Sequence, residues 1–229
     1  MTREPDAAAR PAAATGTPAA LHVETLAVGP FQANCHLVHD PASGEGFVVD
    51  PGAEAERILG RVAALGFRPV YVLLTHGHGD HIAGLETVAC ALRCPVYIHP
   101  ADAPMLESPT ANLSAFAGTP VAAPVAHRTY DDGDELPFAG RTIRVLHTPG
   151  HSAGGVSLFL APDVLFSGDA LFRRSIGRTD FPGGSYEVLR ASIEEKILTL
   201  GDAVRVFPGH DRPTTVGEER RENPFLRPD

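Results

Sequence analysis

The sequence has 229 residues, 43% of them hydrophobic and 21% charged, which suffices for one globular domain with a sizeable buried core. Its formal net charge of -9 repels phosphate backbones, so we expect no nucleic-acid partner. No stretch approaches the roughly 18 apolar residues of a membrane-spanning helix. We therefore expect no membrane partner, and the sequence does not fix the oligomeric state.

Residues 1–20 are rich in Ala and Pro and contain no large apolar side chain, which predicts a disordered tail before a single domain at 21–229. The chain has three cysteines, at positions 35, 90 and 94. This odd, sparse set is not a disulfide framework and favours a reducing compartment, so we expect a cytoplasmic protein. We assign no role in the site to any of the three thiols.

The first half of the chain alternates short β-like runs with one amphipathic helix. Strands are predicted at 21–28, 35–40 and 46–50. Residues 53–65 place apolar side chains at helical spacing, and Gly66 follows where a terminating glycine belongs. The next run, 70–75, is apolar throughout, which is typical of a central strand covered on both faces.

The second half repeats this theme. We expect a helix at 84–92, a strand at 95–99, an irregular stretch at 107–125 that borders a pocket, strands near 141–147, 155–160, 163–167 and 203–207, and a helix near 185–198. Two β-rich halves, each flanked by helices, predict an α/β fold arranged as an αβ/βα sandwich of four layers.

The strongest chemical signal is the segment THGHGDH, which directly follows the apolar strand at 70–75. Four side chains that can bind metal, His76, His78, Asp80 and His81, fall within six residues. The two intervening glycines let the backbone bend, so that one loop can serve two ions. Imidazole together with carboxylate suits zinc, iron or manganese.

Three later segments place a further ligand type after an apolar strand: His151 follows VLHTPG, Asp169 follows VLFSG and His210 follows VFPG. Each alone is ordinary, since a His or Asp beside a turn is usually structural. Together they predict a cluster at the carboxyl ends of the strands, where open α/β folds place their sites.

The chain resembles the metallo-β-lactamase fold superfamily, and more closely its hydroxyacylglutathione hydrolase (glyoxalase II-like) branch. The likeness rests on the HxHxDH loop with the later HTPGH, SGD and PGH segments, and it extends from about Leu21 to the C-terminus through GPFQANC at 29–35, IGRTDF at 176–181 and GEERRENPF at 217–225. Flavodiiron-type relatives have Glu at the second loop histidine, and the best-known β-lactamases have Cys at the position of Asp169, so both match less well.

The resemblance implies a site for two divalent metal ions, with Zn²⁺ favoured and Fe or Mn as alternatives. One ion would be held by His76, His78 and His151, the other by Asp80, His81 and His210, with Asp169 bridging the two. Two departures from the branch stand out. Asp211 replaces a common Gly after His210, and the chain ends at Asp229 without the added C-terminal helical domain from which many glyoxalase II enzymes draw glutathione-binding residues.

The chemistry this implies is hydrolysis by a hydroxide that bridges the two metal ions, most simply of a small-molecule thioester or glutathione-linked substrate such as S-lactoylglutathione. Asp80 and Asp169 would act as catalytic residues by ligating and orienting the hydroxide. Arg178 is the candidate for binding an anionic group of the substrate.

Two other functions stay open at this point. Iron-dependent persulfide dioxygenases share the fold, the loop and a segment like residues 177–181, and would hold one iron on His76, His151 and Asp169. A non-catalytic metal-binding protein is the third hypothesis, disfavoured because all seven ligand positions are filled.

Overall fold

The computed structural model describes residues 21–227, so the predicted tail at 1–20 lies outside the described residues. The first half of the chain contains β1 (His22–Val28), β2 (Ala33–Asp40), β3 (Glu45–Val49), α1 (Ala55–Leu65), β4 (Arg68–Leu73), α2 (Gly79–Ile82), α3 (Leu85–Leu92), β5 (Val96–Ile98), the 3₁₀ turns η1 (Ala103–Leu106) and η2 (Ser114–Phe116), and β6 (Arg128–Thr129). The second half contains β7 (Glu135–Phe138), β8 (Arg141–His147), β9 (Val156–Leu160), β10 (Val164–Gly168), β11 (Leu171–Phe172), β12 (Ser175–Ile176), α4 (Tyr186–Ser192), the π-helical turn η3 (Ile193–Ile197), β13 (Arg205–Pro208), β14 (Thr214–Thr215) and α5 (Val216–Glu222).

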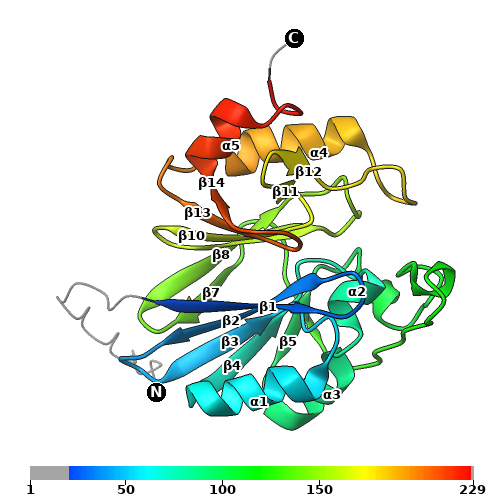
Figure 1. Ribbon diagram of the computed structural model, residues 1–229, viewed down its shortest axis with the longest axis vertical. Helices are drawn as coiled ribbons and strands as arrows, with labels where there is room; N and C mark the ends of the chain where they lie inside the picture. The colour runs from blue at the N-terminus through cyan, green and yellow to red at the C-terminus, as the bar shows by residue number, and fades with distance from the viewer. Residues whose placement is uncertain (1–20, 228–229) are drawn as a thin grey trace, which may run out of the picture.

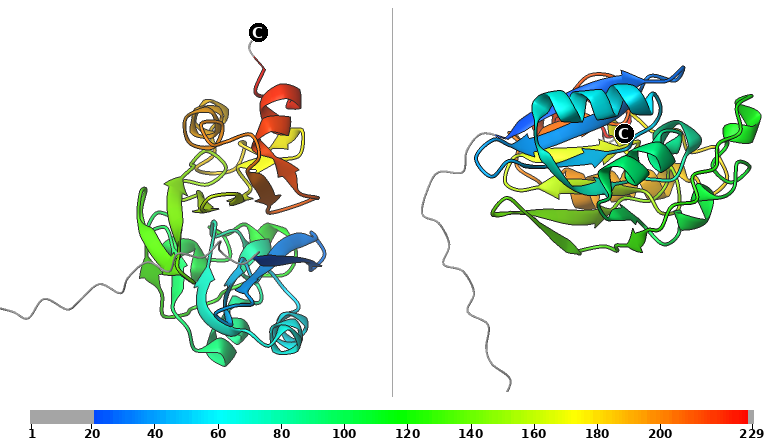
Figure 2. Two further views of the ribbon diagram at one scale, coloured as in Figure 1. Left: turned by 90° about the vertical axis from the view of Figure 1, so that its left-hand side faces the viewer. Right: turned by 90° about the horizontal axis from the view of Figure 1, so that it is seen from below.

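Two six-stranded sheets face each other, in the orders β1-β2-β3-β4-β5-β6 and β14-β13-β10-β9-β8-β7. Helices α1 and α3 cover the outer face of the first sheet, and α4 and α5 cover the outer face of the second (Figure 1). The predicted αβ/βα sandwich of four layers is therefore confirmed. Figure 2 shows the same layers edge on, with the segment that contains η1 and η2 extending to one side of the first sheet.

Three apolar clusters separate the four layers. One packs α1 and α3 against the first sheet and includes Ile58 and Val88. A second fills the space between the sheets and includes Phe47 and Phe166. The third packs α4 and α5 against the second sheet and includes Leu189. Each sheet is thus buried on both faces, which fixes how its strand ends meet those of the other sheet.

Parallel pairing places the functional loops at one edge. In the first sheet β3 is parallel to β4. In the second sheet β10 is parallel to β13, and β8 and β10 both run antiparallel to β9. The carboxyl ends of β8, β10 and β13 therefore lie at one edge of the second sheet. They face the carboxyl ends of β3 and β4 in the first sheet.

Most predicted elements are confirmed, including the helix that ends at Gly66, where φ is 70° and the glycine N–H bonds to the Val62 carbonyl. The apolar run at 70–75 lies in a central strand as predicted, but Val70 and Tyr71 are only half-buried. The helix predicted near 185–198 is two pieces, α4 and η3. The predicted irregular stretch at 107–125 contains η2 and contacts the HxHxDH loop, since Gly79 N–H donates to the Asn112 carbonyl at 2.8 Å.

The sequence reading missed the short strands β6, β7, β11, β12 and β14 and the helix α5. Helix α5 (VGEERRE) has almost no apolar periodicity, but Thr215 caps its first turn by accepting a hydrogen bond from Glu218 N–H. The Thr-x-x-Glu spacing of a capping box was the available signal. Among the described helices, none has the length and apolar character to cross a bilayer.

Candidate metal centre

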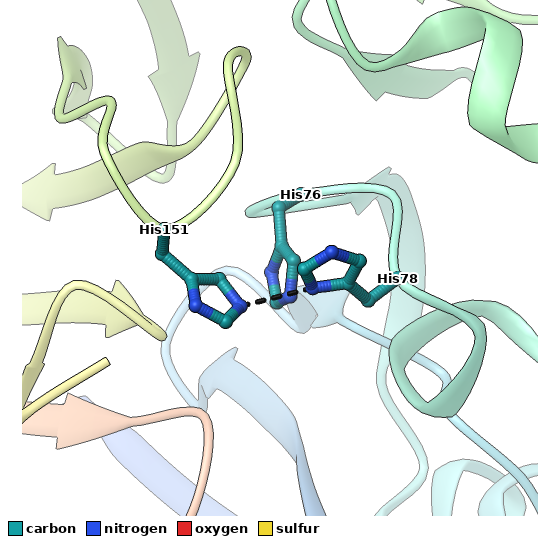
Figure 3. A group of neighbouring side chains, drawn as sticks. All are labelled: His76, His78 and His151. Atoms are coloured by element: carbon teal, nitrogen blue, oxygen red, sulfur yellow. Dashed lines mark hydrogen bonds between the residues drawn. The ribbon is translucent and has the colours of Figure 1, made fainter. Parts of the chain in front are cut away.

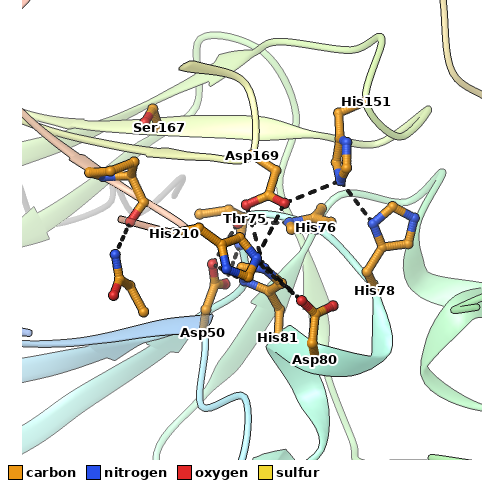
Figure 4. A network of polar contacts seen from close by, with 12 residues as sticks. Asp50, Thr75, His76, His78, Asp80, His81, His151, Ser167, Asp169 and His210 are labelled. Atoms are coloured by element: carbon orange, nitrogen blue, oxygen red, sulfur yellow. Dashed lines mark hydrogen bonds and ion pairs between the residues drawn. The ribbon is translucent and has the colours of Figure 1, made fainter. Parts of the chain in front are cut away.

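Five strand ends meet at one point between the two sheets. The first sheet contributes Asp50 after β3 and the HxHxDH loop after β4, and the second contributes His151, Asp169 and His210 after β8, β10 and β13. All seven predicted metal ligands gather here (Figure 4). The predicted convergence of these distant loops is what the structure shows.

The first group of side chains contains His76, His78 and His151, whose ligand atoms lie within 4.8 Å of one another (Figure 3). All three residues are buried. The closest pair of ring nitrogens, His78 Nδ1 and His151 Nε2, are 2.9 Å apart. Three converging imidazoles of this kind form the usual nitrogen-rich half of a zinc or iron site.

Hydrogen bonds fix which ring nitrogens face the centre of the first group. His151 Nδ1 lies 2.8 Å from the Arg178 carbonyl, which can only accept, so Nδ1 donates this bond and Nε2 faces the centre. Thr75 Oγ1 donates to Asp50 at 2.6 Å and therefore accepts from His76 Nδ1 at 3.0 Å. His76 Nε2 faces the centre in the same way.

The second group contains Asp80, His81 and His210, again with ligand atoms within 4.8 Å of one another. His210 Nε2 lies 3.3 Å from Asp80 Oδ2 and 3.4 Å from His81 Nε2. The side chains of Asp80 and His210 are about one quarter exposed, at 26% and 25%, whereas His81 is fully buried. This group therefore faces the solvent side of the centre.

Asp169 lies between the two groups. Its Oδ2 is 3.5 Å from His151 Nε2 and 3.6 Å from His210 Nε2, and its Oδ1 is 3.5 Å from His81 Nε2. The carboxylate therefore contacts imidazoles of both groups, which is the position that a bridging ligand needs.

The residues present fit a pair of metal ions. Three buried side-chain polar atoms among the described residues have no hydrogen-bond partner, and two of them, His76 Nε2 and Asp169 Oδ1, point into this centre. Orphaned buried polar atoms are costly unless something else binds them. Gly209 leaves room for the carboxylate, since a Cβ there would lie 2.1 Å from Asp169 Oδ1. Nitrogen and carboxylate donors in this ratio suit a divalent cation.

The two groups differ in how they hold protons. Burial, with the positive charge of neighbouring imidazoles, lowers the pKa of His76 and takes the pKa of His78 to about 3. Burial would also lower the pKa of His81, but the carboxylates of Asp80, Asp169 and Asp50 outweigh it and raise that pKa to about 10. Burial would raise the pKa of Asp80, but the neighbouring imidazoles hold it well below its usual range.

Asp50 is a site residue that the sequence reading missed. It is buried and accepts hydrogen bonds from Thr75 N–H at 2.7 Å and Thr75 Oγ1 at 2.6 Å, and it lies 3.1 Å from His81 Nδ1. With its oxygens used in this way, Asp50 orients His81 directly and His76 through Thr75. The signal was present, because VVDPG at 48–52 repeats the pattern of an apolar strand, a ligand-type residue and a turn.

Arg178 lies at the rim of the centre. Its backbone carbonyl binds His151, while its exposed guanidinium pairs with Asp180 at 2.9 Å and stacks on the Phe181 ring at 4.1 Å. Asp211, the departure after His210, has a φ of 63°. A left-handed backbone favours Gly and tolerates Asp, which explains why both residue types suit this position.

Sequence comparison agrees with this geometry. Residues 28–210 match the Metallo-beta-lactamase superfamily. The hydroxyacylglutathione hydrolase GloC of Haemophilus influenzae is 36% identical over 210 residues, which cover 90% of this chain and 98% of that protein. The chain belongs to the metallo-beta-lactamase superfamily. It therefore has a metallohydrolase fold with His and Asp groups suited to divalent metal ions, and the resemblance drawn from its motifs is confirmed.

Solved structures of differently named proteins share this fold. The B3 metallo-beta-lactamase BLEG-1 aligns with a TM-score of 0.86 at 38% identity, covering 90% of this chain and 99% of its own. TTHA1623 in a di-iron-bound form aligns with a TM-score of 0.79 at 40% identity, covering 89% of this chain and 100% of its own. ETHE1 from Myxococcus xanthus aligns with a TM-score of 0.72 at 30% identity, covering 89% of this chain and 83% of its own. Family membership alone therefore does not decide the metal or the substrate.

Proposed function

We propose that this chain is a binuclear metal-dependent hydrolase that cleaves a thioester in a small, glutathione-linked substrate such as S-lactoylglutathione. The observation that carries the proposal is the position of Asp169, whose Oδ2 lies 3.5 Å from His151 of the first group and 3.6 Å from His210 of the second. A carboxylate shared between two ligand groups is typical of two-metal hydrolytic sites. The similarity to GloC supports the substrate class.

The metal ligands in this proposal are His76, His78 and His151 for one ion, Asp80, His81 and His210 for the other, and Asp169 for both. When bound, the ions supply a water of lowered pKa and a Lewis acid for the carbonyl oxygen. The protein's own part is to hold the ligands and to orient that water. We assign zinc as the preferred metal because imidazoles dominate the ligand set, with iron and manganese as the alternatives.

Asp80 and Asp169 act as the catalytic carboxylates. The low pKa of Asp80 keeps it anionic at neutral pH, so it can accept a hydrogen bond from the attacking water. A thiol leaving group, with an ordinary pKa near 8.5, needs little protonation as the bond to the acyl carbon breaks. The site therefore requires no separate general acid for a thioester.

Arg178 is the proposed contact for a carboxylate of the substrate's glutathione part. Its guanidinium is exposed beside the first group and is preorganised by the ring of Phe181 and the carboxylate of Asp180. A substrate anion would replace Asp180 as its partner. We expect Arg178→Ala to raise KM for S-lactoylglutathione about tenfold with little change in kcat, because the contact lies away from the reacting carbonyl.

Arg205 provides a matched control for that variant. It also pairs with an aspartate, Asp163, and stacks on a phenylalanine, Phe207, but it begins β13 at the opposite edge of the second sheet. Arg205→Ala should leave KM unchanged. An equal rise in KM for both variants would contradict the assignment of Arg178.

A second candidate function is a mononuclear iron persulfide dioxygenase, favoured by the structural likeness to ETHE1. It would use His76, His151 and Asp169 as a two-histidine, one-carboxylate set. In that case Asp80, His81 and His210 would have no metal to hold. The orphaned Oδ1 of Asp169, which faces His81, weighs against it.

The deciding experiment measures metal content and substrate turnover on the purified full-length protein. We expect about two equivalents of metal and metal-dependent thiol release from S-lactoylglutathione. One equivalent of iron, with oxygen consumption on glutathione persulfide and no thiol release, would replace the hydrolase with the dioxygenase. A β-lactam in the same panel tests the activity that the name of BLEG-1 indicates.

We also infer a cytoplasmic location and a small-molecule partner. Cys90 is a free and exposed thiol, which suits a reducing compartment, and glutathione conjugates occur where thiols are kept reduced.

A further inference from the structure

Asp102 is a buried carboxylate that belongs to neither metal group. It lies between β5 and η1 and is only 1% exposed. Its backbone is fixed at both polar atoms, since its N–H donates to the His99 carbonyl at 3.0 Å and its carbonyl accepts from Met105 N–H at 2.9 Å. A buried carboxylate is costly unless hydrogen bonds compensate it, so its partners show what it does.

Those partners come from the two loops that carry the first metal group. Gly77 N–H donates to Asp102 Oδ2 at 3.1 Å, and Gly77 stands between His76 and His78. Ser152 Oγ donates to Oδ2 at 2.7 Å, and Ser152 directly follows His151. Gly154 N–H donates to Oδ1 at 2.7 Å. Every ligand of the first group is therefore adjacent in sequence to a donor of Asp102.

The two loops come from different sheets, so local backbone preference cannot set the distance between them. Besides Asp102, the bond from Val156 N–H to the Thr75 carbonyl at 2.8 Å joins the same two loops. The approach is close, since a Cβ on Gly154 would lie 2.7 Å from both the Asp102 backbone nitrogen and its Oδ1. All three donors need an acceptor, and a carboxylate supplies acceptors only.

The second group is held by other residues. Asp50 orients His81, and Asn34 binds the loop of His210, its N–H donating to the Gly209 carbonyl at 2.7 Å and its Nδ2 to the Pro208 carbonyl at 2.9 Å. Asp50 also reaches His76 through Thr75 and so serves both groups. Among the described hydrogen bonds, those of the Asp102 side chain serve only the loops of the first group.

We propose that Asp102 is a positioning residue that sets the spacing of His76, His78 and His151, and hence the affinity of the first metal site, without acting on the second. The proposal rests on the proposed two-metal function. Asp102→Asn keeps the shape of the side chain but turns an NH₂ group toward N–H and O–H donors, which pushes the loops apart.

The test is a titration of the metal-free, full-length protein with Zn²⁺ in competition with a chelating dye. We expect Asp102→Asn to weaken one of two dissociation constants by about 10- to 100-fold, the range typical for residues that orient metal ligands, and to leave the other unchanged. The affected site should be the one that His78→Ala abolishes. Ser152→Ala, which removes one donor, should weaken the same site by a smaller factor and keeps the test decisive if Asp102→Asn does not fold.

Glu219→Gln is the matched control. Glu219 is also fully buried and also accepts three hydrogen bonds, from Arg174 N–H, Thr214 Oγ1 and Asn223 Nδ2, none of which belongs to a metal group. It should lower thermal stability and leave both Zn²⁺ affinities unchanged. Equal weakening of both sites by Asp102→Asn, no weakening of either, or the same weakening by Glu219→Gln would overturn the positioning role. A wild-type protein that binds fewer than two Zn²⁺ would instead overturn the proposed function.

Discussion

The two halves of the metal centre are built on different principles. The first group, His76, His78 and His151, consists of buried imidazoles and contains no carboxylate of its own. The second group pairs the buried His81 with Asp80 and His210, whose side chains are 26% and 25% exposed. The first is a closed set made of imidazoles only, and the second is an open set that includes a carboxylate.

The two groups also differ in the pKa values of their histidines. His76 and His78 have lowered pKa values, so their lone pairs are free at neutral pH. His81, with its pKa raised to about 10, carries a proton among three carboxylates. Metal binding competes with the proton of His81 but not with protons on His76 and His78, so the two groups should respond differently to pH.

The largest effect is expected for Asp169→Asn, because this carboxylate contacts both groups. We expect kcat for thioester hydrolysis to fall more than about 100-fold, beyond the loss typical for residues that only orient ligands, and metal content to fall below two equivalents. Metal analysis and thiol release measure both. Asp211→Gly is the control, since its φ of 63° suits glycine, and it should change neither quantity. Full activity of Asp169→Asn would remove the basis for a shared ligand.

His78→Ala and His81→Ala separate the two groups. Each variant removes one of the three ligands of its group, so each should bind one metal equivalent in place of two and lose most hydrolytic activity. The remaining affinity of each variant reports the group that it keeps. A His78→Ala protein that retains full metal and activity would favour a mononuclear site on His76, His151 and Asp169.

Asp50→Asn tests the residue that connects the groups. Asp50 orients His81 directly and His76 through Thr75, so both Zn²⁺ affinities should fall by about 10- to 100-fold. Asp102→Asn, by contrast, should affect only the first. The same dye-competition titration measures both variants. Selective weakening of one site by Asp50→Asn would show that the relay through Thr75 does not operate.

The smallest expected effect is the release of a single proton when metal binds. At pH 8, below the pKa of about 10 for His81, metal binding to the second group must displace the proton of His81. His76 and His78, with lowered pKa values, have no proton to release. The affinity of the second group should therefore fall as the pH is lowered. Calorimetric titration of His78→Ala with Zn²⁺ in two buffers of different ionisation enthalpy should show this proton release. Equal proton release by His81→Ala would contradict the proposed difference between the two groups.

Much of the site could be predicted from sequence because of one repeated local pattern. An apolar strand, a turn that contains Gly and a His or Asp recur at His151, Asp169 and His210, and at His76 the ligand follows the apolar strand without such a turn. The strands β8, β10 and β13 run in the same direction, so His151, Asp169 and His210 share one edge of the second sheet. The approach of His76, from the first sheet, depends on the packing of the two sheets. Elements without such a pattern were missed. Helix α5 is largely polar and depends on the cap at Thr215 and on the buried Glu219, which accepts a hydrogen bond from Arg174, 45 residues away in the sequence.

The sequence by itself determined the types of ligand, their place after the strands and the family to which the chain belongs. The resemblance also implied which imidazoles form which group. Only the tertiary structure decided which ring nitrogens pair with neighbouring residues, and that Asp50 and Asp102 support the two groups. The physical reason is that ligand types follow from local patterns, whereas these pairings depend on distances between loops of two different sheets. Those distances are set by the packing of the apolar layers and by a few buried hydrogen bonds, which no local pattern encodes.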